Sequence, residues 1–407
     1  MKEESKDVLS GLPANFFSQF KSGSEFQGFM DALFKKGVES LLEAELDDHL
    51  GYPKHEKGAA GNSRNGKTKK TIKTTKGTYR IEVPRDRQGS FSPSVVPKRK
   101  RMIDHIEDVV ISFYAKGMST EDISRQVNEL YGVSITNSTV SNITERILID
   151  VAEWQQRALD RVYLVVWLDG IVFKVRHGGK IINKSVHIIA GLNTEGKKEV
   201  LGLWVSEGAG ESASFWLKTL TDLRARGVED VLIACSDNLS GLTQAIKAVF
   251  PDTVAQLCIV HQIRNSLKKV PYKNRQAVAK DLRIIYEAAD EQKALDGFIL
   301  FESKWGTTYP YICTSWKNNW DNLVPFLSYP MEIRKLIYTT NMIENLNRNV
   351  RKFTKNKTMF PDDSAVTKAV YLAVQHVSKL WTNAMHKWPL IASQFLILYP
   401  TRCQIIF

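Results

Sequence analysis

The stretch Val162–Asp169 limits what this 407-residue chain can fold into more than any other part of the sequence. The seven residues before Asp169 are all apolar and rich in β-branched and aromatic types, which is typical of a strand buried on both faces. If the strand continues through Ile171, Phe173 and Val175, its two-residue period places Asp169 in line with the apolar side chains. A lone carboxylate is unfavourable there unless a charged group meets it, and a metal ion is the predicted partner.

Strand and helix patterns alternate in the segment that begins at residue 151. A turn is expected at His177–Lys180, because two glycines lie between these residues. Three antiparallel strands followed by helix-linked parallel strands predict a mixed sheet with helices on both faces. The predicted strands are 162–175, 184–192, 199–205, 230–236 and 254–260, and the predicted helices are 213–226, 241–250 and 262–270.

Residues 271–335 carry no strand pattern and are predicted to form helices with many aromatic side chains. At their spacing, these aromatic residues are expected to form a helical core. In an alternative interpretation, Trp316 and Trp320 stack on unpaired DNA bases, because an aromatic ring stacks on any base.

The positive charge of the chain is concentrated between Gly51 and Arg101. This segment holds fifteen cationic and three acidic residues, an excess equal to the net charge of +12 for the whole chain. Its sequence predicts a basic β-hairpin that turns near Gly77 and binds the DNA backbone, with a solvated linker as the alternative. The candidate phosphate-binding residues are Arg64, Lys67, Lys69, Lys70, Lys73, Arg85, Arg87, Lys98, Arg99, Lys100 and Arg101.

Helical patterns flank the basic segment on both sides. Residues 14–50 have helical periodicity and an acidic end at 43–48 that is expected to be a surface face; these helices either pair two subunits or cap a domain. Residues 103–150 predict three short helices with helix–turn–helix spacing, although helical trios are also common protein–protein modules. The residues expected to face a major groove are Ser138, Thr139, Ser141, Asn142 and Arg146.

Three carboxylates, Asp169, Asp237 and Glu344, occupy defined places in these elements. Asp169 lies in the first strand, Asp237 follows the fourth, and Glu344 lies at the edge of a late helix with an apolar stripe. Two Mg²⁺ ions assist phosphodiester cleavage when one activates the nucleophile and the other stabilises the leaving oxygen. Because Mg²⁺ prefers hard oxygen ligands, a cluster of Asp and Glu side chains is suited to hold the ions.

Each carboxylate also has a purely structural interpretation. Asp169–Gly170 fits a type I′ hairpin turn, and Asp237 fits the cap of the next helix. Glu344 and Arg348 fit an i,i+4 surface pair. Taken one at a time, these alternatives are as well founded as metal binding. Only the joint arrangement, in a chain with DNA-binding features, favours a catalytic role.

Cys258 and His261 have the spacing of zinc ligands, but no second pair completes a tetrahedral site, so structural zinc is not expected. His261 either contacts phosphate or moves a proton near the carboxylates, or it is a plain buried histidine. The four cysteines are widely spaced and predict reduced thiols. The sequence has neither a secretory signal nor an apolar run of membrane-spanning length, so a cytoplasmic protein without a membrane partner is expected.

The segment from about 160 to 380 resembles the Mutator-type transposases of bacterial insertion sequences, which belong to the DDE group with an RNase H-like catalytic fold. The shared motifs include Ala234–Asp237, Leu257–Leu267 and Tyr338–Arg348, and together with those that follow they are highly specific. Further matches are Trp167–Asp169, Lys174–Arg176, Lys198–Trp204, Phe215–Leu217, Gly227–Asp230, Arg64–Gly66 and Val83–Arg87, so the likeness covers most of the chain.

The resemblance implies that Asp169, Asp237 and Glu344 form the catalytic triad and bind two Mg²⁺ ions, for which Mn²⁺ can substitute. It implies that Cys258 and His261 lie near the site as accessory residues, where Arg348 is also expected. It also implies that a helical insertion fills the 107-residue interval between Asp237 and Glu344. Asn238 departs from the family's usual glycine, which puts only the local turn in question.

The predicted fold is a multidomain α/β protein. An RNase H-like mixed sheet is interrupted by an all-α insertion and preceded by helical and helix–turn–helix regions with a basic β-hairpin. The expected boundaries are 1–57 for a helical region able to dimerise, 58–101 for the hairpin, 102–150 for the helix–turn–helix, 151–270 and 336–385 for the two parts of the catalytic domain, 271–335 for the insertion and 386–407 for the tail.

The predicted function is that of a DNA transposase. It binds the terminal inverted repeats of its insertion sequence, cleaves the DNA ends with metal-activated water and joins the 3′ hydroxyl to target DNA. Because two ends must be held together, a homodimer or higher assembly on double-stranded DNA is expected, in the bacterial cytoplasm and associated with the nucleoid. The alternative is a catalytically idle, repressor-like DNA-binding protein derived from a transposase.

Overall fold

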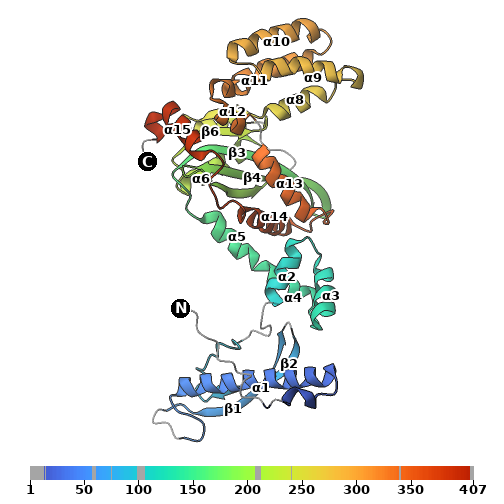
Figure 1. The fold of residues 1–407 in the computed structure, drawn as a ribbon, viewed down its shortest axis with the longest axis vertical. Helices are drawn as coiled ribbons and strands as arrows, with labels where there is room; N and C mark the ends of the chain where they lie inside the picture. The colour runs from blue at the N-terminus through green and yellow to red at the C-terminus, as the bar shows by residue number, and fades with distance from the viewer. Residues whose placement is uncertain are drawn as a thin grey trace. The chain divides into compact units, whose positions relative to one another are not determined.

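The computed structural model describes residues 13, 15–56, 61–74, 76–98, 106–206, 212–239, 241–338 and 341–403. The chain divides into two compact units, which are treated separately below. The N-terminal unit comprises residues 1–112 and 120–140, and the C-terminal unit comprises 113–119 and 141–407. Figure 1 shows the elements of both units along the chain.

One long helix and one hairpin build the core of the N-terminal unit. After the short helix η2 (Phe16–Gln19), α1 (Gly23–Leu50) begins at the N-cap Ser22 and ends at Gly51, whose φ of 75° suits a residue without a side chain. The hairpin strands are β1 (Arg64–Thr74) and β2 (Gly77–Asp86). Val38 and Leu42 on one face of α1 pack with Ile72, Tyr79 and Ile81 of the hairpin, and Leu46 is also buried.

Helices follow the hairpin, as the sequence predicts, but they do not stop at residue 150. The helices are α2 (Ile106–Ala115), α3 (Thr120–Tyr131), α4 (Asn137–Glu145) and α5 (Ile147–Gln156). A fourth helix, α5, starts at the residue where the third was expected to end, and its buried Ile147 and Val151 anchor it in the C-terminal unit. The expected boundary between residues 150 and 151 therefore falls inside a helix.

A five-stranded mixed sheet forms the centre of the C-terminal unit, which confirms the predicted sheet type. Its strands are β3 (Val162–His177), β4 (Lys180–Asn193), β5 (Lys198–Val205), β6 (Asp230–Ser236) and β7 (Val254–Leu257), in the spatial order β5-β4-β3-β6-β7. Strands β3, β4 and β5 pair antiparallel, whereas β6 and β7 run parallel to β3. β7 is shorter than predicted, because the apolar residues Ile259 and Val260 open the next helix instead of extending the strand.

Helices cover both faces of the sheet, as predicted. Helices α6 (Ala213–Ala225) and α7 (Leu242–Val249) pack with Tyr163, Val166 and Leu168 of β3. Helices α13 (Asn341–Thr354) and α14 (Asp363–Ser378) share the core on the opposite face with Trp167 and Val175. The alternation of side chains along β3 thus sends neighbouring residues into two different cores.

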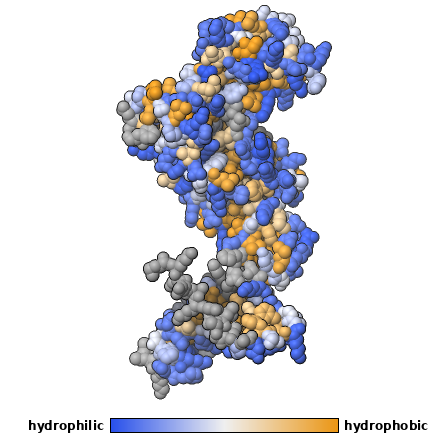
Figure 2. Space-filling model, in the orientation of Figure 1, coloured by the Kyte–Doolittle hydropathy of each residue, from blue (hydrophilic) through white to orange (hydrophobic). Residues whose placement is uncertain are grey.

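Residues 271–335 contain helices and no strand among the residues that the structure describes, as predicted. The sequence of elements is α8 (Ile259–Leu267), α9 (Tyr272–Tyr286), α10 (Glu291–Trp305), α11 (Pro310–Leu323), η3 (Pro325–Ser328) and α12 (Met331–Ile337). Aromatic side chains fill the interior of this layer. Figure 2 shows hydrophobic residues at the surface of this layer. Ile299 and Leu300 of α10 are 56% and 65% exposed.

The proposed stacking role of Trp316 is wrong. Its side chain is fully buried, and its indole N–H donates to Ser266 Oγ at 3.0 Å. A ring enclosed on both sides has no free face for a base. Trp320 is half-buried, and its ring packs at 5.4 Å from that of Phe298. The interpretation of both residues as parts of a helical core fits the structure.

The end of the chain packs onto the C-terminal unit through α15 (Trp388–Leu398) and α16 (Pro400–Cys403). Phe395 is buried, and the guanidinium of Arg402 donates to both carboxylate oxygens of Asp230 at 2.7 and 2.8 Å. All four cysteines are buried free thiols, as expected. No described helix combines the length and apolarity required to cross a bilayer.

Candidate active site

Asp169, Asp237 and Glu344 line one cavity of about 380 Å³ in the C-terminal unit. Asp169 lies within β3, Asp237 directly follows β6, and Glu344 lies in the first turn of α13. Because β3 and β6 are parallel neighbours with Leu168 opposite Ser236, the two aspartates that follow these residues stand side by side at the same edge. The other lining residues are Gly170, His261, Arg264, Asn347, Arg348 and Arg351.

The structural alternatives for the three carboxylates do not fit this arrangement. Asp169 lies in the middle of a continuous strand, and the chain turns at Gly178 and Gly179 instead. The N-cap of α7 is Gly241, four residues after Asp237. The guanidinium of Arg264 donates to Glu344 at 2.8 Å, so the partner of Glu344 comes from α8 rather than from its own helix.

Two donors hold the carboxylate of Asp169. Its Oδ1 accepts from the Gly170 N–H at 2.7 Å, and its Oδ2 accepts from Asn347 Nδ2 at 2.5 Å. Burial and the neighbouring charge of Asp237 nevertheless raise its pKa to about 6. Since a cation bound between the two carboxylates would relieve this repulsion, the electrostatics of the cavity favour a cationic ligand.

His261 lies between two of the carboxylates, which distinguishes it from a plain buried histidine. Its Nδ1 is 2.5 Å from Asp237 Oδ1, and its Nε2 is 3.8 Å from Glu344 Oε1. Its hydrogen bonds with Asp237 and then Cys258 raise the pKa of the imidazole to about 10, despite partial burial. At neutral pH His261 is therefore a cation that pairs with Asp237.

Asp237, Cys258 and His261 also bring three possible metal-ligand atoms within 4.8 Å of one another. The sequence offered only the Cys258–His261 pair, and the structure adds a carboxylate to it. In the structure, His261 Nδ1 lies 2.5 Å from Asp237 Oδ1, and the two side chains form an ion pair.

Exposed arginines are among the residues that line the cavity. Arg348 lines it as expected, and Arg351, one turn further along α13, does so as well. Both side chains are exposed, so they are accessible to an anion that enters. A cavity that combines carboxylates with exposed arginines suits a phosphodiester held by a metal ion.

Sequence reasoning missed Arg264 and Asn347 as members of the site. Arg264 lies three residues after His261 on α8, so both reach the cavity from one helical face. Asn347 lies three residues after Glu344 and is only 3% exposed. The unusual number of asparagines in α13 indicated that these residues make contacts, but not which of them meets Asp169.

The cavity gathers oxygen donors of the kind that a divalent cation requires. Three carboxylates from separate parts of the chain face one space, and two of them, Asp237 and Glu344, are only about one-fifth exposed. Hard oxygen ligands of this kind suit Mg²⁺ and Mn²⁺, which retain several waters. The residues present therefore fit a divalent cation site.

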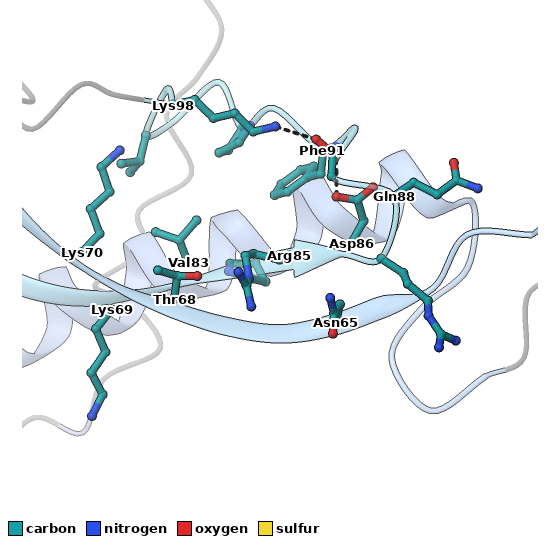
Figure 3. Close-up of a pocket in the computed structure, with 15 residues that line it drawn as sticks. Asn65, Thr68, Lys69, Lys70, Val83, Arg85, Asp86, Gln88, Phe91 and Lys98 are labelled. Atoms are coloured by element: carbon teal, nitrogen blue, oxygen red, sulfur yellow. Dashed lines mark hydrogen bonds between the residues drawn. The ribbon is translucent and has the colours of Figure 1, made fainter.

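The predicted phosphate-binding cations of the N-terminal unit have two distinct environments. A groove of about 510 Å³ beside the hairpin is lined by Lys69, Lys70, Arg85, Arg87 and Lys98 (Figure 3). Arg64 and Lys67 instead pair with Asp47 and Glu43 of α1. The acidic end of α1 is thus a hairpin contact and not only a solvated face.

Two of the lysines that line the groove also donate hydrogen bonds to the backbone. Lys70 Nζ donates to Pro97 O at 2.9 Å, and Lys98 Nζ donates to Gly89 O at 2.8 Å. Lys73, which does not line the groove, donates through Nζ to Ser134 O. Figure 3 shows Lys69 and Lys70 pointing to opposite sides of β1, as expected for neighbours in a strand. Arg99, Lys100 and Arg101 lie outside the described residues.

The residues predicted to face the major groove of DNA, in α4 and directly after it, lie mainly at the surface. Ser138, Asn142 and Arg146 are exposed, whereas Thr139 and Ser141 are half-buried, and they alternate with the buried Val140 and Ile143. The Thr136 hydroxyl accepts from the Thr139 N–H at 3.2 Å and caps the helix. An amphipathic helix with a small, polar outer face suits a DNA groove or a protein surface equally.

Comparison with known proteins gives a consistent match along the chain. Residues 13–384 match the family model described as "Transposase, Mutator family". The chain is 40% identical over 376 residues to the transposase for insertion sequence element ISRM3 of Rhizobium meliloti, covering 92% of this chain and 93% of that protein. It is 32% identical over 375 residues to the transposase for insertion sequence element IS905 of Lactococcus lactis, covering 92% and 94%.

Proposed function

Because the chain belongs to the Mutator family of transposases, we propose that its carboxylate cavity cleaves and joins DNA with the help of two Mg²⁺ ions. Asp169, Asp237 and Glu344 are the proposed ligands, and Mn²⁺ is expected to substitute. The observation that carries the proposal is the meeting of these three carboxylates with Arg264, Arg348 and Arg351 in a single cavity. The five-stranded mixed sheet and the helical layer between Asp237 and Glu344 support an RNase H-like domain with an insertion.

The metal ions, when bound, supply charge neutralisation and activation of water at the scissile phosphate. The protein's own groups prepare the site for them. Gly170 and Asn347 orient the carboxylate of Asp169, and Arg264 holds that of Glu344. Arg348 and Arg351 are placed to attract the phosphodiester to the cavity.

The remaining steps of the proposed activity rest on the DNA-binding elements. The hairpin groove and the exposed face of α4 are proposed to bind the terminal inverted repeats of the element. Cleavage frees a 3′ hydroxyl, which then attacks a phosphodiester of the target DNA without a covalent protein–DNA intermediate. A homodimer or larger assembly is proposed, since two ends must be joined in one event.

The test replaces each proposed ligand by its neutral isostere in Asp169→Asn, Asp237→Asn and Glu344→Gln. Each variant is expected to lose at least about 10³-fold in end cleavage with Mg²⁺, because one metal ligand disappears, yet to bind end-containing DNA normally. Glu229→Gln, an exposed carboxylate paired with Arg161 in the same unit, is the matched control and should cleave normally.

Two results would overturn the proposal. Strand transfer retained by any of the three variants would remove that residue from the triad. No nicking by the unaltered protein with Mg²⁺ or Mn²⁺, together with normal end binding, would identify the chain as a repressor-like relative without catalytic activity.

A further inference from the structure

The β3–β4 hairpin continues beyond the carboxylate cavity as a two-stranded ribbon, here called the outer ribbon and defined as residues 172–183. Strand β6 pairs with β3 only from Val162 to Leu168, so the edge of β3 is free of β6 from Asp169 onward. In the outer ribbon, Lys174 lies opposite Asn183 and Arg176 lies opposite Ile181. The ribbon therefore begins at the edge where the cavity lies.

One face of the outer ribbon is covered. Phe173 and Val175 are buried, the Phe173 ring packs against that of Phe360, and the Arg176 N–H donates to Phe360 O at 2.9 Å. Just beyond the ribbon, the buried Lys184 pairs with Asp363 at the start of α14 at 2.6 Å. This face belongs to the core beneath α13 and α14.

The opposite face is open among the described residues. Helices α6 and α7 pack over Val166, Leu168 and Ile189, and the core that they form includes no residue of the outer ribbon. Val172 and Ile181 are consequently 59% and 58% exposed, and Lys174 and Arg176 beside them are also exposed. A sheet face that carries apolar and cationic side chains without a covering layer is available to a partner.

The charge of the outer ribbon identifies the class of that partner. Residues 172–183 contain Lys174, Arg176 and Lys180 and no Asp or Glu. None of these three side chains forms an ion pair with a described residue, unlike Arg64 and Lys67 in the other hairpin. An isologous contact with a second copy of the chain would place these cations against each other, whereas a polyanion complements them.

From this arrangement we propose that the open face of the outer ribbon binds the backbone of duplex DNA next to the scissile phosphate. This inference rests on the proposed function of the cavity. At about 3.3 Å per residue, Lys174 and Arg176 lie roughly 17 and 23 Å along β3 from Asp169, which is less than one turn of DNA. Their side chains point to the face opposite that of Asp169. Phe360 pairs with the edge of β3 at Val175, so the duplex must pass over this edge between Asp169 and Phe173.

The first test measures the salt dependence of DNA binding by the full-length variant Lys174→Ala/Arg176→Ala. Losing two phosphate contacts should lower the slope of log affinity against log salt concentration by about 2 and weaken binding uniformly across sequences. Lys174→Arg/Arg176→Lys keeps the charges and should restore the slope. Lys247→Ala/Lys379→Ala removes two exposed lysines, one on α7 and one at the far end of α14, and should leave it unchanged.

The second test locates the DNA directly. A photo-cross-linking amino acid at Ile181 should capture labelled duplex DNA, whereas the same group at Leu380, which is 76% exposed, should not. Using the Asp169→Asn protein makes this readout independent of catalysis, so it stands even if the triad assignment fails. Differently labelled element-end and target duplexes distinguish the source of the bound DNA.

Two results would overturn the inference. An unchanged salt slope in Lys174→Ala/Arg176→Ala, with normal thermal stability, would show that these cations do not contact phosphate. Cross-linking from Ile181 to a second protein chain, and not to either duplex, would make the open face a subunit interface.

Discussion

The β1–β2 hairpin and the β3–β4 hairpin each contain one shielded aspartate, and the two carboxylates have opposite environments. Asp86 is 4% exposed and accepts hydrogen bonds from Asn62 Nδ2, from the N–H and hydroxyl of Ser90, and from the Phe91 N–H. Burial alone would raise its pKa, but these hydrogen bonds hold the pKa below the ordinary range. Asp169 has two donors, and burial together with Asp237 raises its pKa to about 6.

The difference separates a structural carboxylate from one that we propose to bind a metal ion. Hydrogen bonds within the protein compensate the charge of Asp86. These bonds hold the loop that follows β2 in place. The charge of Asp169 is incompletely compensated and opposes a second carboxylate, so it remains available to an external cation. Both carboxylates are shielded from solvent, so burial does not distinguish them. The number of hydrogen bonds that each carboxylate accepts does.

The largest expected effect is on stability. Asp86→Ala leaves the Ser90 and Phe91 amides without their acceptor in a buried position, so we expect the N-terminal unit to lose about 2–4 kcal/mol. Amide hydrogen exchange at Ser90 and Phe91 should accelerate accordingly. Asp169→Ala removes a carboxylate that Asp237 repels, so amide exchange in β3 should be unchanged or slower. Equal losses of stability in both variants would show that the two carboxylates do not differ in this way.

Asn347 donates a hydrogen bond to Asp169, and Asn62 donates one to Asp86, so the two asparagines form a matched pair for substitution. Asn347→Ala should lower end cleavage roughly 10- to 100-fold, because the proposed metal ligand loses its orienting contact. Asn62→Ala should leave cleavage intact and lower the stability of the N-terminal unit. Metal titration by calorimetry should show weaker binding for Asn347→Ala only. Normal metal affinity in that variant would mean that Asn347 does not position Asp169.

Lowering the pH should destabilise the folded protein through Asp86 and stabilise it through Asp169. The folded-state pKa of Asp86 lies below the unfolded value of about 3.9, so its stabilising contribution is complete above that pH and is lost as the pH falls further. For metal-free Asp169 the folded-state pKa of about 6 exceeds the unfolded value, so folding becomes more favourable between pH 6 and 4.

Spectroscopy can separate these responses. All nine tryptophans lie between residues 154 and 388, so indole fluorescence follows the C-terminal unit alone, while circular dichroism follows both. The stability advantage of the unaltered protein over Asp86→Asn should shrink as the pH falls from about 4 to about 3. The fluorescence-detected stability of the unaltered protein relative to Asp169→Asn should rise from pH 7 to pH 4.

The smallest effects should come from the cations of the first hairpin. Arg64→Ala, which breaks the pair with Asp47, should cost up to about 1 kcal/mol of stability. Lys69→Ala should instead leave stability unchanged and lower the salt slope of DNA binding by about 1. DNA affinity and thermal melts of both variants check the division. If Arg64→Ala lowered the salt slope and Lys69→Ala lowered the stability, ion pairing in the free protein would not predict which cations contact DNA.

Much of the secondary structure was predictable because local patterns determine it. The continuous apolar run before Asp169 specified a central strand, and the glycines at 178 and 179 specified its turn. The error at the end of β7 arose because the short apolar run from Cys258 to Val260 suits a strand or a buried helix equally. The stacking assignment of Trp316 failed because aromatic spacing does not reveal which ring is enclosed.

The sequence alone determined the element types, the excess of positive charge near the N-terminus and, through the motifs shared with a known family, the identity of three candidate carboxylates. Only the tertiary structure decided that Asn347 meets Asp169 and that His261 lies between Asp237 and Glu344. It also decided that Arg64 pairs with Asp47 of α1, whereas Lys174 and Arg176 have no acidic partner in the part of the chain that the structure describes. The physical reason is separation along the chain. Asp169 and Asn347 are 178 residues apart, and no local pattern encodes the register that joins them.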